Sequence, residues 1–287
     1  MSPDVVTKAR RMIVAIVVPL LDAVALAEGD AVAQTAAEKS DRTRQADSSD
    51  DQRSATADPA RRWRVELKRQ NTDRGTPGET TETLVRTELF PDGAISMWRL
   101  DLPFPDARTD FAGKPYDPHL GDIKVRARAR TFEARGLPLS AYVELTFPTA
   151  NPEDLGQGKY QVTPGIETYI LLHSYRLKSS THKLSFEPLV EQDVSVAGDD
   201  NFKNINYTKF ELPLRDAWRN YSLKLTLKPV IDWEQDGATG AVLELEGQMG
   251  FARDWAAKLM LGHRVWGGST IPSTYGSRIE LSVAYRF

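Results

Sequence analysis

The chain of 287 residues contains no cysteine, and beyond residue 27 it has no apolar run long enough to form a membrane-spanning helix. The missing cysteines exclude a disulfide-stabilised scaffold and lipid attachment to a mature N-terminal cysteine. No pair of histidines has the spacing of a zinc site, and no glycine-rich phosphate-binding loop is present. We therefore expect no metal and no other cofactor.

An excess of charge of one sign is also lacking, because 37 lysines and arginines are set against 40 acidic residues. A nucleic-acid-binding protein usually concentrates basic residues on one surface, whereas the basic residues here alternate with apolar ones. The sequence therefore predicts no nucleic-acid partner.

The first 27 residues have the layout of a secretory signal peptide. Basic residues within 8–11 precede the apolar run 12–21, small residues at 25–27 form a cleavage site, and a second such site lies at 31–33. The alternative is an uncleaved membrane anchor, but the run is shorter than the ~20 residues that a spanning helix needs. We expect residues 1–27 to be removed on export, with the choice of cleavage site left open.

Residues 28–61 are rich in Ser, Asp, Gln, Arg and Ala and have almost no aromatic or β-branched side chains. Such a segment buries too little apolar area to offset the entropy lost on ordering. It is expected to be a disordered polar linker, whose role the residues do not specify.

From residue 62 to 287 the chain becomes a series of strand patterns separated by turn signals. In 221–233, for example, apolar residues from Tyr221 to Trp233 occupy every second position, which is the side-chain period of a β-strand. Twelve such segments can be phased, among them 182–196 and 208–214, and the last of them lies at 277–287. An irregular turn is expected at 173–180 and a short one at 215–220. The expected fold class is all-β, an antiparallel barrel of about 12 strands.

The connections distinguish a membrane barrel from a soluble β-sandwich, which a single alternating strand would fit equally well. Long polar connections such as 105–120 and 267–277 alternate with short ones such as 91–93 and 251–254. Outer-membrane barrels pair short periplasmic turns with longer outer loops in this way. We therefore expect residues 62–287 to form a transmembrane β-barrel in the outer membrane of a Gram-negative cell.

Nearly all charged residues of the strands fall on the face opposite the apolar one, as expected when a lipid-facing Arg or Lys costs about 2–4 kcal/mol near the midplane. The predicted pore-lining residues are Lys124, Arg126, Arg128, Arg130, Glu144, Glu167, Glu187, Lys224, Lys228, Glu244 and Glu246.

Two interpretations of this lining stay open. The basic fourth strand and the acidic tenth strand would lie opposite each other in a ring of twelve, and their charges would set up a transverse field that orients polar solutes. Alternatively, neighbouring acids such as Glu144, Glu167 and Glu187 neutralise the arginines as internal ion pairs.

The final strand ends with Tyr285 and Phe287 in its apolar phase. This ending resembles the C-terminal signal that outer-membrane proteins present to the barrel assembly machinery, and the resemblance implies that machinery as a partner. Trp63, Trp233 and Trp255 also lie at strand ends, where aromatic side chains contact the lipid interface. The expected partners are the assembly machinery, membrane lipid and small-molecule solutes.

Residues 120–166 contain four short motifs: a Gly-Asp strand start, a strand closing on Pro-Thr, a Leu-Gly-x-Gly loop and a strand with Pro-Gly. They are Gly121-Asp122, Pro148-Thr149, Leu155-Gly156-Gln157-Gly158 and Pro164-Gly165. This pattern resembles the phenol-degradation meta-pathway outer-membrane family, although Ala150 stands where that family usually has glycine. The resemblance implies a transporter-like barrel that takes up small, often aromatic, compounds.

These features predict a channel for passive or facilitated passage of small molecules, not an enzyme. Twelve strands fall between filled barrels and the open 16–18-stranded porins, so a narrow or partly occluded pore is expected. The solute and the oligomeric state are left open. The alternatives are a lipid-modifying enzyme that uses His263 with Ser269 or Ser273, or an adhesive barrel that displays outer loops, of which Phe104–Leu120 is the longest.

Overall fold

The computed structural model describes residues 63–74, 76, 79–106 and 117–287. The predicted signal peptide 1–27 and the predicted linker 28–61 lie outside the described residues. Among the described residues, no helix is long and apolar enough to cross a membrane.

The described chain is almost entirely β-structure, with two short 3-10 helices, η1 (Glu153–Leu155) and η2 (Trp233–Gln235). The strands are β1 (Trp63–Thr72), β2 (Thr80–Leu89), β3 (Ile95–Pro105), β4 (Ile123–Ala129), β5 (Phe132–Ala134), β6 (Leu137–Phe147), β7 (Lys159–Thr168), β8 (Ile170–Leu177), β9 (Ser180–Phe186), β10 (Leu189–Gly198), β11 (Asn206–Trp218), β12 (Tyr221–Asp232), β13 (Ala238–Ala252), β14 (Trp255–Trp266) and β15 (Ser277–Arg286).

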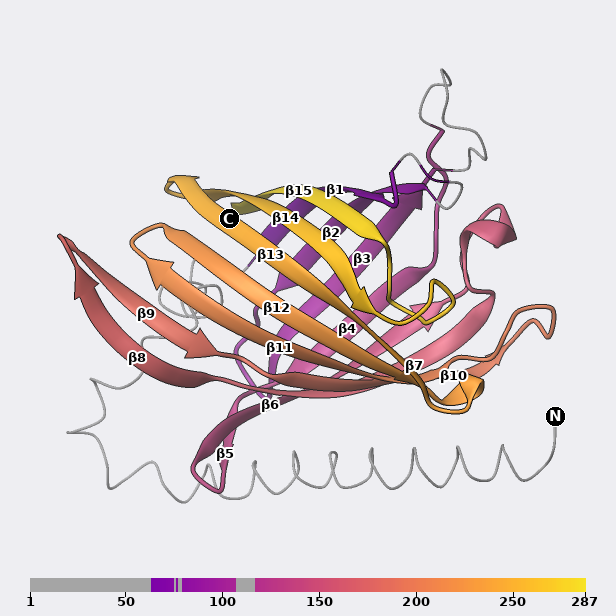
Figure 1. Cartoon of the computed structure of the whole chain (residues 1–287), viewed down its shortest axis with the longest axis horizontal. Helices are drawn as coiled ribbons and strands as arrows, with labels where there is room; N and C mark the ends of the chain where they lie inside the picture. Colours follow the sequence, from indigo (N-terminus) through magenta and orange to yellow (C-terminus); the bar gives the residue numbers. More distant parts are fainter. Residues whose placement is uncertain (1–62, 75, 77–78, 107–116) are drawn as a thin grey trace.

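The strands close into a twelve-strand antiparallel barrel (Figure 1), which confirms the predicted fold class. The barrel has twelve strands because three pairs of consecutive strands are collinear, and each pair occupies one position in the wall. These pairs are β4 with β5, β7 with β8, and β9 with β10. The first and last strands, β1 and β15, pair in register from Arg64 opposite Arg286 to Thr72 opposite Arg278. The β10–β11 pair completes the ring.

Two predicted strand bounds near the middle of the chain are wrong. The segment predicted as one strand at 182–196 breaks between β9 and β10, because Pro188 has no N–H to donate to a strand ladder. The predicted irregular turn at 173–180 is tighter than expected. Strand β8 continues to Leu177, and the chain reverses at Lys178, whose φ of 54° is left-handed, and at Ser179.

The third corrected bound is the end of β11, which was predicted at Leu214 with a turn at 215–220. The strand continues to Trp218, so the turn contains residues 219–220. The sequence suggested a turn at Asp216 because a charged residue there interrupts the apolar phase of the strand. Its carboxylate accepts the Tyr175 hydroxyl at 2.9 Å and lies 3.0 Å from His182 Nδ1, both of them on the β8–β9 hairpin.

The connections divide between the two ends of the barrel as predicted. The end that carries the short connections 90–94, 135–136, 178–179, 219–220 and 253–254 is called the turn end. Both termini of the barrel lie there, and Phe287 N donates to Trp63 O at 3.0 Å. The opposite end, called the loop end, carries the longer connections 73–79, 106–122, 148–158, 199–205, 233–237 and 267–276.

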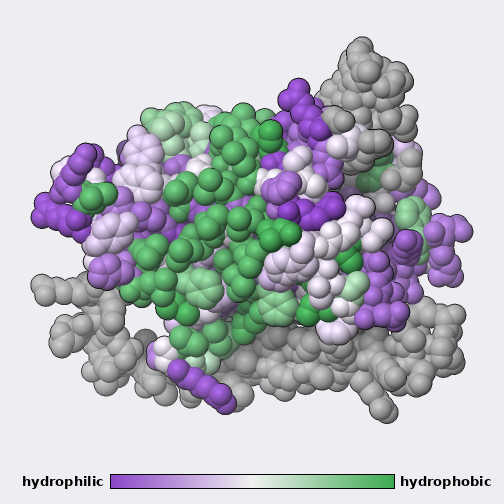
Figure 2. Space-filling view, in the orientation of Figure 1, coloured by the Kyte–Doolittle hydropathy of each residue, from purple (hydrophilic) through white to green (hydrophobic). Residues whose placement is uncertain are grey.

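The barrel is apolar outside and polar inside. Leu67, Leu245 and Leu281 are 54%, 42% and 56% exposed, and Figure 2 shows apolar side chains gathered over the wall formed by β11 to β14. The buried residues, in contrast, include many charged and polar ones, such as Glu66 and Thr163. This is the reverse of a soluble protein, in which charged residues are almost never fully buried unless they are paired.

Candidate functional site

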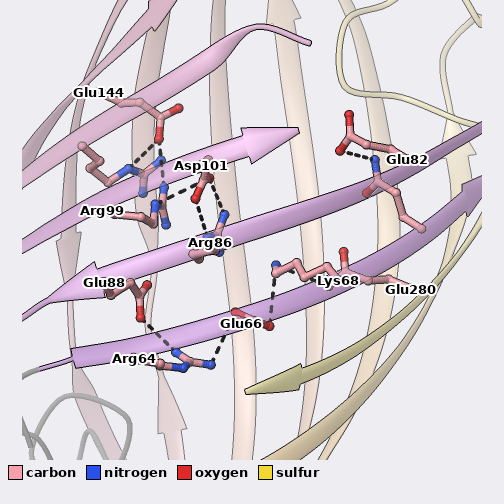
Figure 3. Close-up of polar contacts among 12 residues, drawn as sticks. Arg64, Glu66, Lys68, Glu82, Arg86, Glu88, Arg99, Asp101, Glu144 and Glu280 are labelled. Carbon is pink, nitrogen blue, oxygen red and sulfur yellow. Dashed lines mark hydrogen bonds and ion pairs between the residues drawn. The ribbon is translucent and has the colours of Figure 1, made fainter. Parts of the chain in front are cut away.

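The inner face of β1, β2 and β3 carries a row of ion pairs (Figure 3). Arg86 and Asp101 are directly opposite in the β2–β3 register and form a two-pronged contact, with Nε–Oδ1 and Nη2–Oδ2 distances of 2.8 and 2.7 Å. Nearer the turn end, Arg64 Nη1 lies 3.2 Å from Glu88 Oε2, and Arg64 Nη2 lies 3.5 Å from Glu66 Oε2. Strand phase brings these charges to one face, and register pairs them.

Glu144 on β6 joins this row to β4. Its Oε2 accepts hydrogen bonds from Arg99 Nη2 and Arg126 Nε, both at 2.9 Å. The Arg126 guanidinium also lies 4.0 Å from the centre of the Tyr142 ring, a cation–π contact. One carboxylate thus compensates two guanidinium groups on the inner wall.

Tyr142 and Glu191 extend the network to β10 and β11. The Tyr142 hydroxyl donates to Glu191, which also pairs with Lys209, and Arg126 Nη2 lies 3.8 Å from Glu191. The Tyr142 ring occupies the space above Gly165, where an added Cβ would lie 2.2 Å from Tyr142 Cζ. A glycine in the predicted Pro-Gly motif therefore makes room for an inward tyrosine.

The opposite wall has its own cations. Lys228 Nζ lies 2.8 Å from Glu244, and Lys224 Nζ lies 3.1 Å from Glu246. Lys258, on the next strand, lies 3.6 Å from Glu246. The acidic residues of β13 are thus neutralised by β12 and β14, and the structure shows the ion-pair arrangement on both walls.

The remaining predicted lining residues differ in their surroundings, because some have polar partners and others are exposed. Arg128 Nη1 pairs with Glu167 at 2.7 Å, as the neutralising interpretation expects. Glu187 lies between β9 and β10, where its carboxylate accepts the Ser185 hydroxyl at 2.9 Å. Arg130 lies one residue beyond β4 and is exposed. Lys124 is in the inner phase, yet it is also exposed.

The loop 267–276 turns into the loop end of the lumen. Its Ile271 and Tyr275 are 6% and 3% exposed, and the Tyr275 hydroxyl donates to Glu244 Oε1 at 2.5 Å. Burial and the nearby Glu244 carboxylate raise the pKa of the Tyr275 hydroxyl, so it stays protonated as a donor. Ile271 packs in a cluster with Tyr207 and Val230.

Sequence reasoning did not single out this loop, and named Phe104–Leu120 as the longest outer loop. Residues 107–116 of that segment lie outside the described residues. The signal in the sequence for this loop was a pair of glycines in the inner phase of β13 and β14, which leave room for side chains of the loop 267–276. An added Cβ would lie 2.4 Å from the Tyr275 hydroxyl at Gly262 and 2.8 Å from Thr274 Cγ2 at Gly240.

The motifs at residues 121–158 meet at the loop end. The buried Asp122 carboxylate accepts Ala150 N at 3.2 Å and Gln157 N at 2.6 Å, which ties the start of β4 to the connection 148–158. Thr149 Oγ1 donates to Gly121 O at 3.0 Å. Side chains larger than glycine are excluded at Gly156, where an added Cβ would lie 2.5 Å from Asp122 Oδ1.

Aromatic side chains gather on the outer surface at the turn end. The Tyr285 ring lies 4.7 Å from that of Trp255 and 4.9 Å from that of Phe287. Trp63, Trp255 and Phe287 are all exposed. Trp233, in η2, lies at the loop end and donates through Nε1 to Thr208 at 2.9 Å.

The residues considered for lipid chemistry are exposed. His263 is exposed on β14, and Ser269 and Ser273 are exposed in the loop that follows. Among the described residues, no group of three or more His, Cys, Asp or Glu side chains could hold a metal ion.

The fold is similar to the crystal structure of an outer-membrane channel from Pseudomonas putida F1, with a TM-score of 0.52 and 14% sequence identity over 78% of this chain and 94% of that chain. The NanC porin matches with a TM-score of 0.49 and 6% identity, over 78% of this chain and 100% of that chain. The KdgM porin matches with a TM-score of 0.47 and 8% identity, over 78% and 99%.

No protein-family model matches the chain, and no curated protein matches it in sequence. Membership of the phenol-degradation meta-pathway family therefore stays a prediction. The similarity to the Pseudomonas putida structure supports the barrel fold, which the strand pairing defines independently.

Proposed function

We propose that this protein is an outer-membrane channel that lets small polar molecules pass through a narrow, charge-lined lumen. The observation that carries the proposal is the inverted barrel, with exposed leucines such as Leu245 outside and charged residues such as Arg126 and Glu144 inside. The protein whose fold is similar is itself described as an outer-membrane channel.

The outer membrane is the proposed location because of the apolar outer surface. Closed barrels satisfy all backbone hydrogen bonds between strands and so can cross lipid, and aromatic residues at both ends fit the two membrane interfaces. The turn end would face the periplasm and the loop end the cell exterior. We also propose that Tyr285 and Phe287, on the exposed edge of the closing strand, engage the assembly machinery before the barrel closes.

The side chains and the loop inside the lumen would restrict the passage of solutes. Ion pairs such as Arg126–Glu144 and Lys228–Glu244 fill the inner wall, and the loop 267–276 occupies the loop end. A solute would therefore pass beside balanced charges, which favours polar molecules over wholly apolar ones. Uptake of aromatic compounds rests on the family resemblance alone.

Single-channel conductance of the refolded full-length protein in a planar lipid bilayer tests the proposal. The informative variant is Lys124→Glu, because Lys124 is exposed in the inner phase of β4 and its replacement leaves the Arg126–Glu144 pair intact. The matched control is Lys178→Glu at the tip of the β8–β9 hairpin. We expect discrete conductance steps, with cation preference increased by Lys124→Glu and unchanged by Lys178→Glu.

Absence of conductance from a verified folded barrel would contradict the channel. Folding is checked by the slower electrophoretic mobility after boiling that closed barrels show. Equal ion selectivity for Lys124→Glu and the wild type would show that ions do not pass along the inner face of β4.

A further inference from the structure

A cavity of about 610 Å³ lies at the turn end of the barrel. Its wall comes from the ends of β11 to β15, the start of β1 and the turns at 219–220 and 253–254. Inner-phase residues such as Ser222, Gln248 and Ala284 belong to this wall, so the cavity continues into the lumen. Its volume is within the range of small-molecule sites.

Arginine dominates the charge of this cavity. Among the described residues, five guanidinium groups line it against one carboxylate; they belong to Arg64, Arg215, Arg219, Arg253 and Arg286, and the carboxylate belongs to Asp254. The middle of the lumen is different, because its cations and carboxylates are matched. Within this cavity, guanidinium groups therefore outnumber carboxylates.

Two of these arginines contact neutral partners. Arg215 Nη2 lies 3.4 Å from Ser222 Oγ, and Arg219 Nη2 donates to Ser179 Oγ at 2.8 Å. Arg64, in contrast, lies between Glu66 and Glu88 in Figure 3 and is neutralised by them. A hydroxyl partner leaves the charge of a guanidinium uncompensated, so Arg215 and Arg219 keep the capacity to bind an anion.

A concave surface lined by one sign of charge focuses its potential and concentrates solutes of the opposite sign. The planar guanidinium group also matches a carboxylate geometrically, because two N–H groups can donate to its two oxygens. Several guanidinium groups around one cavity would favour a ligand with more than one carboxylate.

We propose that this cavity binds small organic anions that carry two or more carboxylate groups, with Arg215 and Arg219 as the main contacts. The inference goes beyond the proposed channel, because such a site would bind its ligand even in a barrel that does not conduct. With the turn end toward the periplasm, the site would be loaded from the periplasmic side.

Isothermal titration calorimetry of citrate into the full-length protein, refolded in a non-ionic detergent at low ionic strength, tests the site. The variant Arg215→Gln/Arg219→Gln removes the two charges without breaking an ion pair that the described residues form. The matched control is Arg74→Gln, which changes an exposed arginine at the opposite end. Heat-modifiable mobility checks that all variants are folded.

We expect citrate to bind the wild type and Arg74→Gln equally, and the double variant at least about tenfold more weakly. High salt should weaken binding to the wild type, because the interaction is electrostatic. Acetate, with one carboxylate, should bind at least about tenfold more weakly than citrate. No binding to the folded wild type, equal citrate binding by the double variant, or acetate binding as tight as that of citrate would each overturn the proposal.

The carboxylates that bind in this cavity could belong to a free solute or to the chain itself, since Asp47, Asp50 and Asp51 precede β1 in the sequence. The full-length variant Asp47→Asn/Asp50→Asn/Asp51→Asn separates these sources. Tighter citrate binding than in the wild type would assign the chain's own carboxylates as a competing ligand of the same site. Unchanged binding would assign the site to free solutes alone.

Discussion

Glu144 shows how much a single inner-face residue contributes to this barrel. Its carboxylate accepts from both Arg99 and Arg126 at 2.9 Å and is nearly inaccessible to solvent. Glu144→Gln should therefore lower the free energy of unfolding by about 3 kcal/mol, because two guanidinium groups lose their shared anion. Urea titration in detergent micelles, followed by tryptophan fluorescence, measures this change.

The matched control is Glu133→Gln, which neutralises an exposed acid on the short strand β5. Its effect should be within about 0.5 kcal/mol of the wild type, as for most surface substitutions. Equal unfolding midpoints for the two variants would show that the Glu144 pairs add nothing to stability.

Gly262 gives a second prediction at the scale of one residue. A methyl group there would lie 2.4 Å from the Tyr275 hydroxyl, whereas at Gly247 on the neighbouring strand it would meet no atom within 4 Å. Gly262→Ala should cost about 1–3 kcal/mol of unfolding free energy through overpacking, and Gly247→Ala should be nearly neutral. The same urea titration compares them, and a neutral Gly262→Ala would contradict the inward placement of Tyr275.

At the residue scale, the sequence grouped Arg126 with Glu144 but did not give every partner of Arg126. Alternation alone placed Arg126 and Glu144 on the inner face, and their direct opposition on β4 and β6 follows from strand order. The contact of Arg126 with Glu191 on β10 was out of reach, because it depends on the curvature of the wall and on the room that Gly165 leaves for Tyr142.

At the scale of elements, the loop 267–276 is the segment whose position matters most for passage. Ile271 and Tyr275 fix it inside the loop end through an apolar cluster and a hydrogen bond to Glu244. The double variant Ile271→Ala/Tyr275→Ala should release the loop and raise single-channel conductance. Ser269→Ala, at an exposed position of the same loop, should leave conductance unchanged. Unchanged conductance in the double variant would show that the loop does not limit the pore.

The elements themselves were predictable because a period of two repeats along every strand. The strand number, the antiparallel closure and the alternation of long and short connections followed from that period and from turn residues. The errors occurred where one residue overrides the pattern. Pro188 ends a ladder that the alternation continues, and Asp216 extends β11 because Tyr175 and His182 supply partners for its carboxylate.

At the scale of the whole molecule, the described residues of the barrel form no conventional apolar core. Its largest fully buried side chains include Glu66 and Thr163, while its leucines are exposed. In water this surface would be an aggregation hazard, since exposed apolar patches of this extent mark interaction surfaces. Lipid removes the hazard, because the leucines then face hydrocarbon and the charged groups keep their partners inside.

Leu245 offers the sharpest test of that inversion, because it lies at the centre of β13 between Leu225 and Leu261 on the neighbouring strands. In lipid vesicles, Leu245→Arg should lower the free energy of unfolding by about 2–4 kcal/mol, the cost of an arginine facing the membrane midplane. Leu245→Ala is the control for lost side-chain volume and should cost clearly less. Urea titration of both variants in vesicles measures the difference. Equal stability of the two variants would mean that this wall does not face lipid, because a solvent-exposed strand tolerates arginine as readily as alanine.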